Sequence, residues 1–148
     1  MANTASAPLS QPLYGAGFGQ AITRFFQKYA TFTGRASRSE YWWFFLFNAI
    51  VGIVLYILAF ALGGPRVDTE TNTVVYGAGY WIFISIAAIW GLATLVPHLA
   101  IVWRRLHDTN RPGPLYFLAF IPFVGGIILI VLLAGATNPA GARFDTAA

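Results

Sequence analysis

The sequence predicts an all-α membrane protein with three transmembrane helices, and two observations lead to this fold class. Of its 148 residues, 57% are hydrophobic and only 9% are charged, whereas a soluble domain carries about 25% charged residues. In addition, residues 41–63, 80–103 and 114–134 contain no charged residue at all. Charge-free stretches of this length indicate segments that cross lipid rather than the core of a soluble protein.

The sequence predicts three parts along the chain. Residues 1–16 are small, polar and uncharged, which predicts a disordered N-terminal arm. They lack the basic start and apolar core of a signal peptide. Residues 17–134 are expected to form a single helical membrane domain, and residues 135–148 a polar C-terminal tail.

A short amphipathic helix is expected at the start of the membrane domain. Large apolar side chains recur at helical spacing from Phe18 to Tyr29, and polar and cationic residues fill the other face. Such a helix suits the membrane–water interface, and packing on other protein is the alternative. We expect Gly34 to end this helix in the left-handed conformation.

The first span follows a helix-start signal. Ser37 and Glu40 have the spacing of a capping box, in which each side chain bonds the backbone amide of the other residue. The 23 uncharged residues from Tyr41 to Gly63 come next. As a helix they would be about 34 Å long, enough to cross a hydrocarbon core of about 30 Å. Trp42 and Trp43 stand at the start of this span, where interfacial aromatics are common.

The second span, residues 80–103, follows a polar loop over residues 64–79. A charged loop over residues 104–111 then leads to the third span. Pro122 and the pair Gly125-Gly126 weaken the middle of that third span. The alternative is therefore a re-entrant pair of short helices, which would return the tail to the side from which the chain came.

The distribution of cations predicts the orientation. Four Lys and Arg residues precede the first span, one lies in the next loop, three lie in the loop after that, and one lies in the tail. By the positive-inside rule, the N-terminus and the loop over residues 104–111 are cytoplasmic. We therefore expect a multi-pass protein of the bacterial inner (plasma) membrane with a cytoplasmic N-terminus, and three spans would put the tail outside.

Two motifs resemble those of a known family. The stretch from Phe32 to Trp43, FTGRASRSEYWW, and the stretch from Arg104 to Thr109, RRLHDT, are similar to the two motifs of domain-of-unknown-function family 805. This resemblance covers roughly residues 24–145. It implies a small bacterial inner-membrane protein with several spans, and it supplies no catalytic residue. Pro112 and Pro114 depart from the small and aromatic residues usual in the family.

The predicted topology puts the charged residues of both motifs at one cytoplasmic mouth. We call these residues the charged cluster: Arg35, Arg38, Glu40, Arg104, Arg105, His107, Asp108 and Arg111. Three roles are open for it. The acids could pair with the arginines and clamp two helix ends together. The arginines could instead bind anionic lipid headgroups, at about 1 kcal/mol per cation, or a partner protein.

Few residues in the sequence suggest metal binding or catalysis. The chain has no cysteine, and no second His or Cys lies near His107 to complete a metal site. No serine elbow, phosphate loop or paired carboxylates are present. We therefore expect no cofactor, no metal site and no catalytic residue. The net charge of +4 is too sparse for nucleic acid, which leaves membrane lipids, another copy of the chain or a membrane protein as partners.

The predicted spans contain one amide side chain, Asn48, and one imidazole, His98. Asn48 lies about 10 Å inward from the start of the first span, and His98 about 7.5 Å inward from the end of the second. Because these helices run in opposite directions, the two depths match, and polar groups in hydrocarbon tend to bond each other. We expect Asn48 and His98 to face each other. The alternative is that His98 reaches lipid phosphate at the interface.

These features favour a non-enzymatic membrane interaction or scaffold module that works through its arginine-rich cytoplasmic mouth. The first alternative is a small oligomeric transporter or channel component. Three nearly apolar spans cannot line a water path alone, so transport would require several copies or a partner. A lipid-headgroup enzyme is the second alternative.

Overall fold

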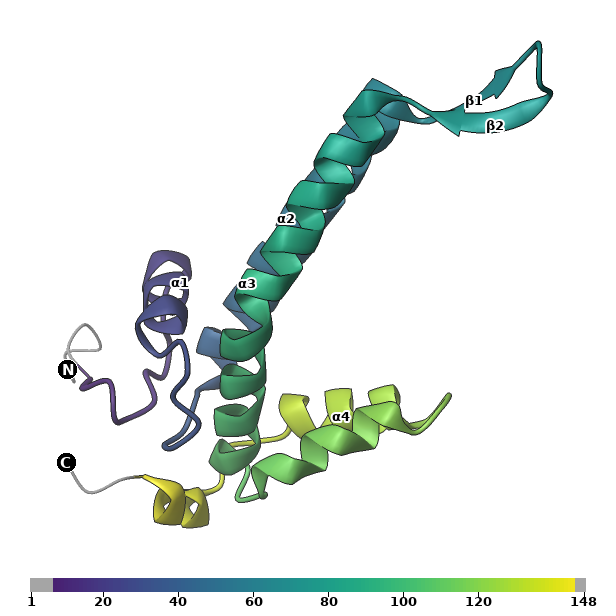
Figure 1. Ribbon diagram of the computed structural model, residues 1–148. Coiled ribbons are helices and arrows are strands. Elements are labelled where there is room, and N and C mark those ends of the chain that lie inside the picture. Colours follow the sequence, from purple (N-terminus) through teal and green to yellow (C-terminus); the bar gives the residue numbers. More distant parts are fainter. Residues whose placement is uncertain (1–6, 146–148) are drawn as a thin grey trace. The chain divides into compact units, whose positions relative to one another are not determined.

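The computed structural model of this chain describes residues 7–145 and is mostly helical. Along the chain it contains the elements α1, α2, β1, β2, α3, η1, α4 and η2, where η marks a 3-10 helix (Figure 1). Of the described residues, those up to Phe45 and from Val96 onward form one compact unit, the first unit. Residues Leu46–Leu95 form the second unit.

The N-terminal segment of the first unit is packed against the protein. Its described part, residues 7–16, has no helix or strand, yet Leu13 and Ala16 are buried. This differs from the disordered arm expected over residues 1–16, because side chains from distant parts of the chain hold this backbone. Residues 1–6 of the expected arm lie outside the described residues.

Helix α1 (Phe18–Gln27) lies where an amphipathic helix is expected, but it ends well before Gly34. Lys28 already leaves the helical backbone, and the Thr31 amide donates to the Lys28 carbonyl in a turn. The β-branched and aromatic residues that follow favour helix only weakly. Gly34 does have a left-handed φ of +78°, but its amide donates to the Phe144 carbonyl instead of closing the helix.

Helix α2 (Arg38–Gly63) begins at the predicted capping box. The Glu40 amide donates to Ser37 Oγ over 3.2 Å, and the Ser37 amide donates to Glu40 Oε2 over 2.9 Å. Both bonds of the motif are therefore present. From this start the helix continues for 26 residues and contains the whole of the predicted first span, residues 41–63.

Helix α3 (Ala78–Asp108) contains the predicted second span and is longer than expected. Its 31 residues include Arg104 and Arg105, which the sequence predicts to lie in a loop. That prediction is wrong because Arg and Leu favour helix and no Gly or Pro interrupts the turns after Trp103. The helix ends before Asn110, whose φ of +59° is left-handed.

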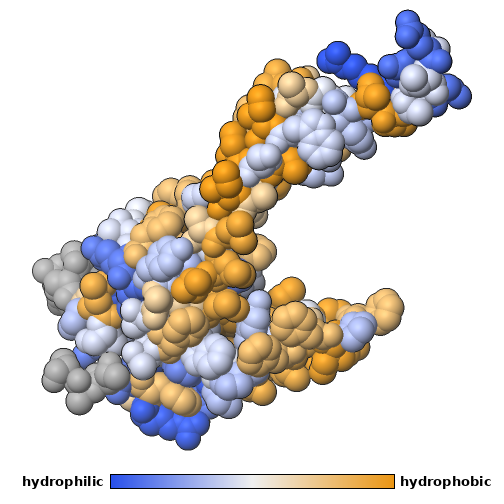
Figure 2. All heavy atoms as spheres, in the orientation of Figure 1, coloured by the Kyte–Doolittle hydropathy of each residue, from blue (hydrophilic) through white to orange (hydrophobic). Residues whose placement is uncertain are grey.

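Among the described residues, α2 and α3 are the helices that are long and apolar enough to cross a membrane. Only 6% and 11% of their most apolar windows are buried inside the protein, so they are not core helices of a soluble domain. Many large apolar residues on these helices are exposed, and much of the visible face of the long helical part is apolar in Figure 2. Such a surface is stable in lipid, and a helix satisfies its own backbone there.

A β-hairpin occupies the predicted polar loop over residues 64–79. The chain is therefore not entirely α-helical, which differs from the predicted all-α fold class. Strand β1 (Pro65–Asp68) pairs antiparallel with β2 (Thr73–Tyr76). The Asp68 carboxylate accepts bonds from the amides of Glu70 and Thr71 and fixes the turn between the strands. The apolar residues in this loop are too few for their periodicity to indicate a strand.

The predicted third span, residues 114–134, is not one helix. Residues Gly113–Phe120 form η1 and residues Gly125–Ala134 form α4, and the two pack together as a hairpin (Figure 1). The chain breaks here because Pro122 lacks an amide hydrogen and its ring would clash with the preceding turn. The break matches the alternative expected at Pro122. Each leg is about 15 Å long, half the thickness of a hydrocarbon core.

The C-terminal tail is folded against the first unit as far as the described residues extend. It contains η2 (Pro139–Phe144), which starts after Asn138. The Asn138 amide donates to the Asp108 carbonyl, and the Phe144 carbonyl accepts the bond from Gly34. The tail is thus tied to the end of α3 and to the segment that precedes α2.

Gly125 allows the two legs of the hairpin to approach closely. A Cβ atom at this position would overlap the carbonyl oxygen of Leu118, whereas a Cβ atom at Gly126 would meet open space. Both glycines lie in the first turn of α4. They therefore offer a matched pair of substitutions.

We expect Gly125→Ala to destabilise the protein by about 1–3 kcal/mol, because the Leu118 backbone must move to make room. Gly126→Ala is the control, and it should be neutral or gain up to about 1 kcal/mol from helix propensity. Melting temperatures of the purified variants in detergent measure the difference. Equal melting temperatures would contradict the close approach.

Candidate functional site

The structure brings the two sequence motifs together within the first unit. The amide of Ala36 donates to the carbonyl of Arg104 over 3.0 Å, which joins the start of α2 to the end of α3. Five members of the charged cluster have buried side chains: Glu40, Arg104, Arg105, His107 and Asp108. Because burying a charge is costly unless it is paired, the partners of these residues decide what the cluster does.

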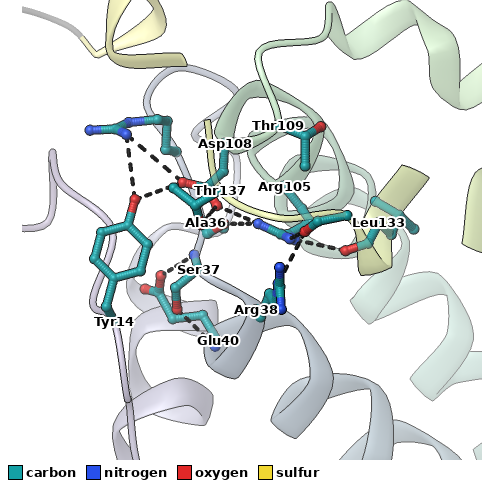
Figure 3. Close-up of polar contacts among 12 residues, drawn as sticks. Tyr14, Ala36, Ser37, Arg38, Glu40, Arg105, Asp108, Thr109, Leu133 and Thr137 are labelled. Atoms are coloured by element: carbon teal, nitrogen blue, oxygen red, sulfur yellow. Dashed lines mark hydrogen bonds and ion pairs between the residues drawn. The ribbon is translucent and has the colours of Figure 1, made fainter. Parts of the chain in front are cut away.

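Asp108 lies at the centre of the charged cluster (Figure 3). One of its oxygens, Oδ2, accepts bonds from Arg105 Nη1 and, over 2.7 Å, from Thr137 Oγ1. The other, Oδ1, accepts a bond from the Tyr14 hydroxyl over 2.8 Å, and Arg35 Nη1 lies 3.9 Å from it. One carboxylate therefore connects the N-terminal segment, α3 and the tail.

The Tyr14 hydroxyl is held in its neutral form by this contact. Burial, together with the hydrogen bond to Asp108, raises the pKa of Tyr14 to about 12. A neutral phenol can donate to the carboxylate, whereas a phenolate would repel it. Tyr14 thus acts as a donor to Asp108 over the whole physiological range of pH.

Arg105 caps the end of α4. Its Nε donates to the Leu133 carbonyl over 2.8 Å, and its Nη2 donates to the Gly135 carbonyl over 2.5 Å. Arg38 Nε donates to the same Gly135 oxygen over 3.0 Å. The last carbonyls of a helix have no partner within it, and nearby cations stabilise that end. One arginine from each motif therefore holds the hairpin.

Glu40 bonds the N-terminal segment rather than the arginines of the cluster. Its Oε1 accepts a bond from Arg24 Nε over 2.6 Å, and its Oε2 accepts the Leu13 amide over 3.2 Å. Arg24 also donates to backbone carbonyls of the segment, among them that of Gln11 over 2.5 Å. The sequence gives no sign of this role for Arg24, because a cation on the polar face of such a helix is usually solvated.

Arg35 pairs with the tail. Its Nε lies 3.0 Å from both oxygens of Asp145, and its Nη2 donates to Oδ2 over 2.7 Å. These hydrogen bonds raise the pKa of Arg35, and such multiple contacts are stronger than a single ion pair. His107 lies nearby, where its Nδ1 donates to the Gly34 carbonyl over 3.0 Å and its ring stacks on Phe144 at 4.1 Å.

Arg104 and Arg111 make fewer polar contacts. Arg104 Nε donates to the Ala100 carbonyl within α3 over 3.2 Å. Its Nη1 is buried and has no hydrogen-bond partner among the described residues. Arg111 is half-buried, and its amide donates to the Leu106 carbonyl.

No metal-binding group is found within residues 7–145, since no three His, Cys, Asp or Glu side chains come together there. His107 and Asp108, which are adjacent in sequence, have separate partners.

A groove with a volume of about 410 Å³ lies beside α1, lined by Ala7, Leu9, Leu13, Gly19, Gln20, Thr23, Arg24 and Gln27. Its one charged residue, Arg24, is already paired with Glu40.

Asn48 and His98 lie in different units. Within the second unit, Asn48 Oδ1 accepts a bond from Trp90 Nε1 over 2.9 Å, a partner that the sequence does not suggest. Within the first unit, the His98 ring lies 6.0 Å from the ring of Phe44. The pairing of Asn48 with His98 stays a prediction.

Comparison with known proteins identifies the family. Residues 29–146 match the family described as "Protein of unknown function (DUF805)", and this range contains both motifs. The chain belongs to the DUF805 family. The resemblance of its two motifs to domain-of-unknown-function family 805 is therefore confirmed.

Two relatives of this DUF805 protein are named as inner membrane proteins. Inner membrane protein YhaI of Escherichia coli (strain K12) is 38% identical over 105 residues, which are 71% of this chain and 75% of the relative. Inner membrane protein YhaH of the same strain is 36% identical over 118 residues, which are 80% and 87% of the two chains. No solved structure matches the chain. The relatives and the two long apolar helices confirm the prediction of a membrane protein.

Replacing the central carboxylate should destabilise the DUF805 fold. We expect Asp108→Asn to cost about 3–5 kcal/mol, because the buried Arg105 loses its counter-charge. Glu70→Gln, in the exposed turn of the β-hairpin, is the matched control and should change stability by less than about 0.5 kcal/mol. Unfolding of both variants in detergent gives the comparison, and a similar small effect for both would argue against the central role of Asp108.

Proposed function

We propose that this chain is a non-enzymatic scaffold of the inner membrane, in which the charged cluster clamps a re-entrant hairpin to the ends of two spanning helices. The observation that carries this proposal is the position of Arg105, whose fully buried side chain bonds Asp108 and the last carbonyls of α4. Because these protein partners already occupy the guanidinium of Arg105, this side chain is not available to a lipid headgroup. A lipid-headgroup enzyme would require a titratable group in an open cleft.

The proposed topology has two spanning helices and both termini in the cytoplasm. Seven of the nine Lys and Arg residues lie before Tyr41 or around the end of α3, which supports a cytoplasmic N-terminus. The pair of Arg35 with Asp145 supports a cytoplasmic tail, because a third spanning helix would place these residues on opposite sides of the membrane. Phe18 and Phe26 are exposed on α1, which supports its position at the interface.

One observation favours a transporter or channel component as a second candidate. The turn between η1 and α4 is irregular backbone, and Phe123 in that turn is 96% exposed. Irregular backbone at membrane depth is tolerated where protein or a water-filled cavity covers it. Several copies of the chain, arranged around such hairpins, would supply that cover.

Reporter fusions test the topology. A cytoplasmic reporter at Arg111 and a periplasmic reporter at Thr71 should both be active, because cations alternate across the two spans. A cytoplasmic reporter after Ala148 should also be active if the hairpin is re-entrant. Activity of a periplasmic reporter at the C-terminus would instead indicate a third span, and activity of one at Arg111 would overturn the whole orientation.

Reconstitution tests the function. Liposomes that contain the purified chain should pass no more ions or small solutes than empty liposomes, and their phospholipids should remain intact, because the proposed scaffold has neither a water path nor a catalytic group. Measurable flux together with detergent-resistant oligomers would favour the second candidate. Turnover of a phospholipid that is lost in His107→Ala would favour an enzyme.

A further inference from the structure

Two buried cations of the first unit each have a nitrogen without a hydrogen-bond partner among the described residues. Lys28 Nζ and Arg104 Nη1 are closed off from solvent and have no hydrogen-bond partner among residues 7–145. The two residues are only 4% and 1% exposed. Burial and then the charge of Arg104 lower the pKa of Lys28 to about 8, and the opposite charge of Glu40 offsets this only in part. Two unpaired charges of the same sign are strongly unfavourable in a protein interior.

The carboxylates of the first unit do not supply the missing partner. Its three acidic residues are Glu40, Asp108 and Asp145, against eight Lys and Arg residues. Both oxygens of Glu40 are bonded by Arg24 and by backbone amides. Both oxygens of Asp145 are bonded by Arg35, and both oxygens of Asp108 also have donors. Positive charge therefore remains in excess at Lys28 and Arg104.

The two cations lie below the surface of the first unit, at the end of α1 and near the end of α3. Lys28 is the residue at which α1 ends, and the linker to α2 passes close by, because the Ala36 amide bonds the Arg104 carbonyl. Gln27 and Tyr29, on either side of Lys28, are exposed.

We propose that Lys28 and Arg104 form a binding site for a phosphate group. Phosphate has several acceptor oxygens, so it can accept bonds from the ammonium and from the free guanidinium nitrogen at the same time. Its negative charge would also remove the repulsion between the two cations. A lipid headgroup and free inorganic phosphate offer the same chemistry. The site is independent of the scaffold function, which rests on Arg105 and Asp108.

The test measures the melting temperature of the purified full chain in a phosphate-free maltoside detergent. Inorganic phosphate at about a hundred-fold excess over its Kd should raise the melting temperature of the wild type by roughly 5–10 °C, and sodium chloride at equal ionic strength should not. Lys28→Met should abolish this rise. Without phosphate it should melt above the wild type, because it removes a buried, unpaired charge. Arg66→Met, on the exposed β-hairpin, is the matched control and should keep the full response.

A second arm identifies the source of the phosphate. Dihexanoyl phosphatidic acid and dihexanoylglycerol differ only by the phosphate group, so they are added to the same samples. A rise with phosphatidic acid alone, lost in Lys28→Met, assigns the site to a lipid headgroup. A rise with inorganic phosphate and none with phosphatidic acid assigns it to free phosphate, and a rise with both shows that the phosphate group alone is sufficient for binding. No rise with either probe, or a rise that persists in Lys28→Met, overturns the proposal.

Discussion

The bond between Asp108 and Arg105 places two opposite charges in the interior of the first unit, where neither side chain is accessible to solvent. Each charge would be very costly to bury alone, and a single ion pair leaves lone pairs and N–H groups unsatisfied. Tyr14 and Thr137 also donate to the carboxylate, and the backbone carbonyls of Leu133 and Gly135 accept further bonds from the guanidinium. Three distant segments are thereby joined at one ion pair.

The hairpin of η1 and α4 depends on this arrangement. Helix α4 has 10 residues, and a helix of that length has little stability by itself. Its outer side chains are apolar and exposed, so contacts within the protein cover only part of it. The caps from Arg38 and Arg105 therefore fix where α4 ends, and the close approach at Gly125 fixes how it lies on η1.

The parts of this structure that could be predicted from the sequence depend on neighbouring residues. The capping box of Ser37 and Glu40 has a defined spacing, and the two long spans are marked by the absence of charge. The partners within the charged cluster are a different case, because Tyr14 lies 94 residues before Asp108. One sequence contains no signal for such a pair. For the same reason residues 7–16 have the composition of a disordered arm, although distant side chains hold them in place.

The position of the tail has a consequence for biosynthesis. The chain is made from its N-terminus, so both long helices are complete before the ribosome reaches Gly135 and Asp145. Arg35 and Arg38 can therefore bond Asp145 and Gly135 only when translation is almost finished. Contacts between such distant residues form slowly. A nascent chain that stops before Gly135 would have both long helices but several arginines without acceptors. Because cellular proteases remove poorly folded chains, we expect residues 135–145 to contribute to the survival of a newly made copy.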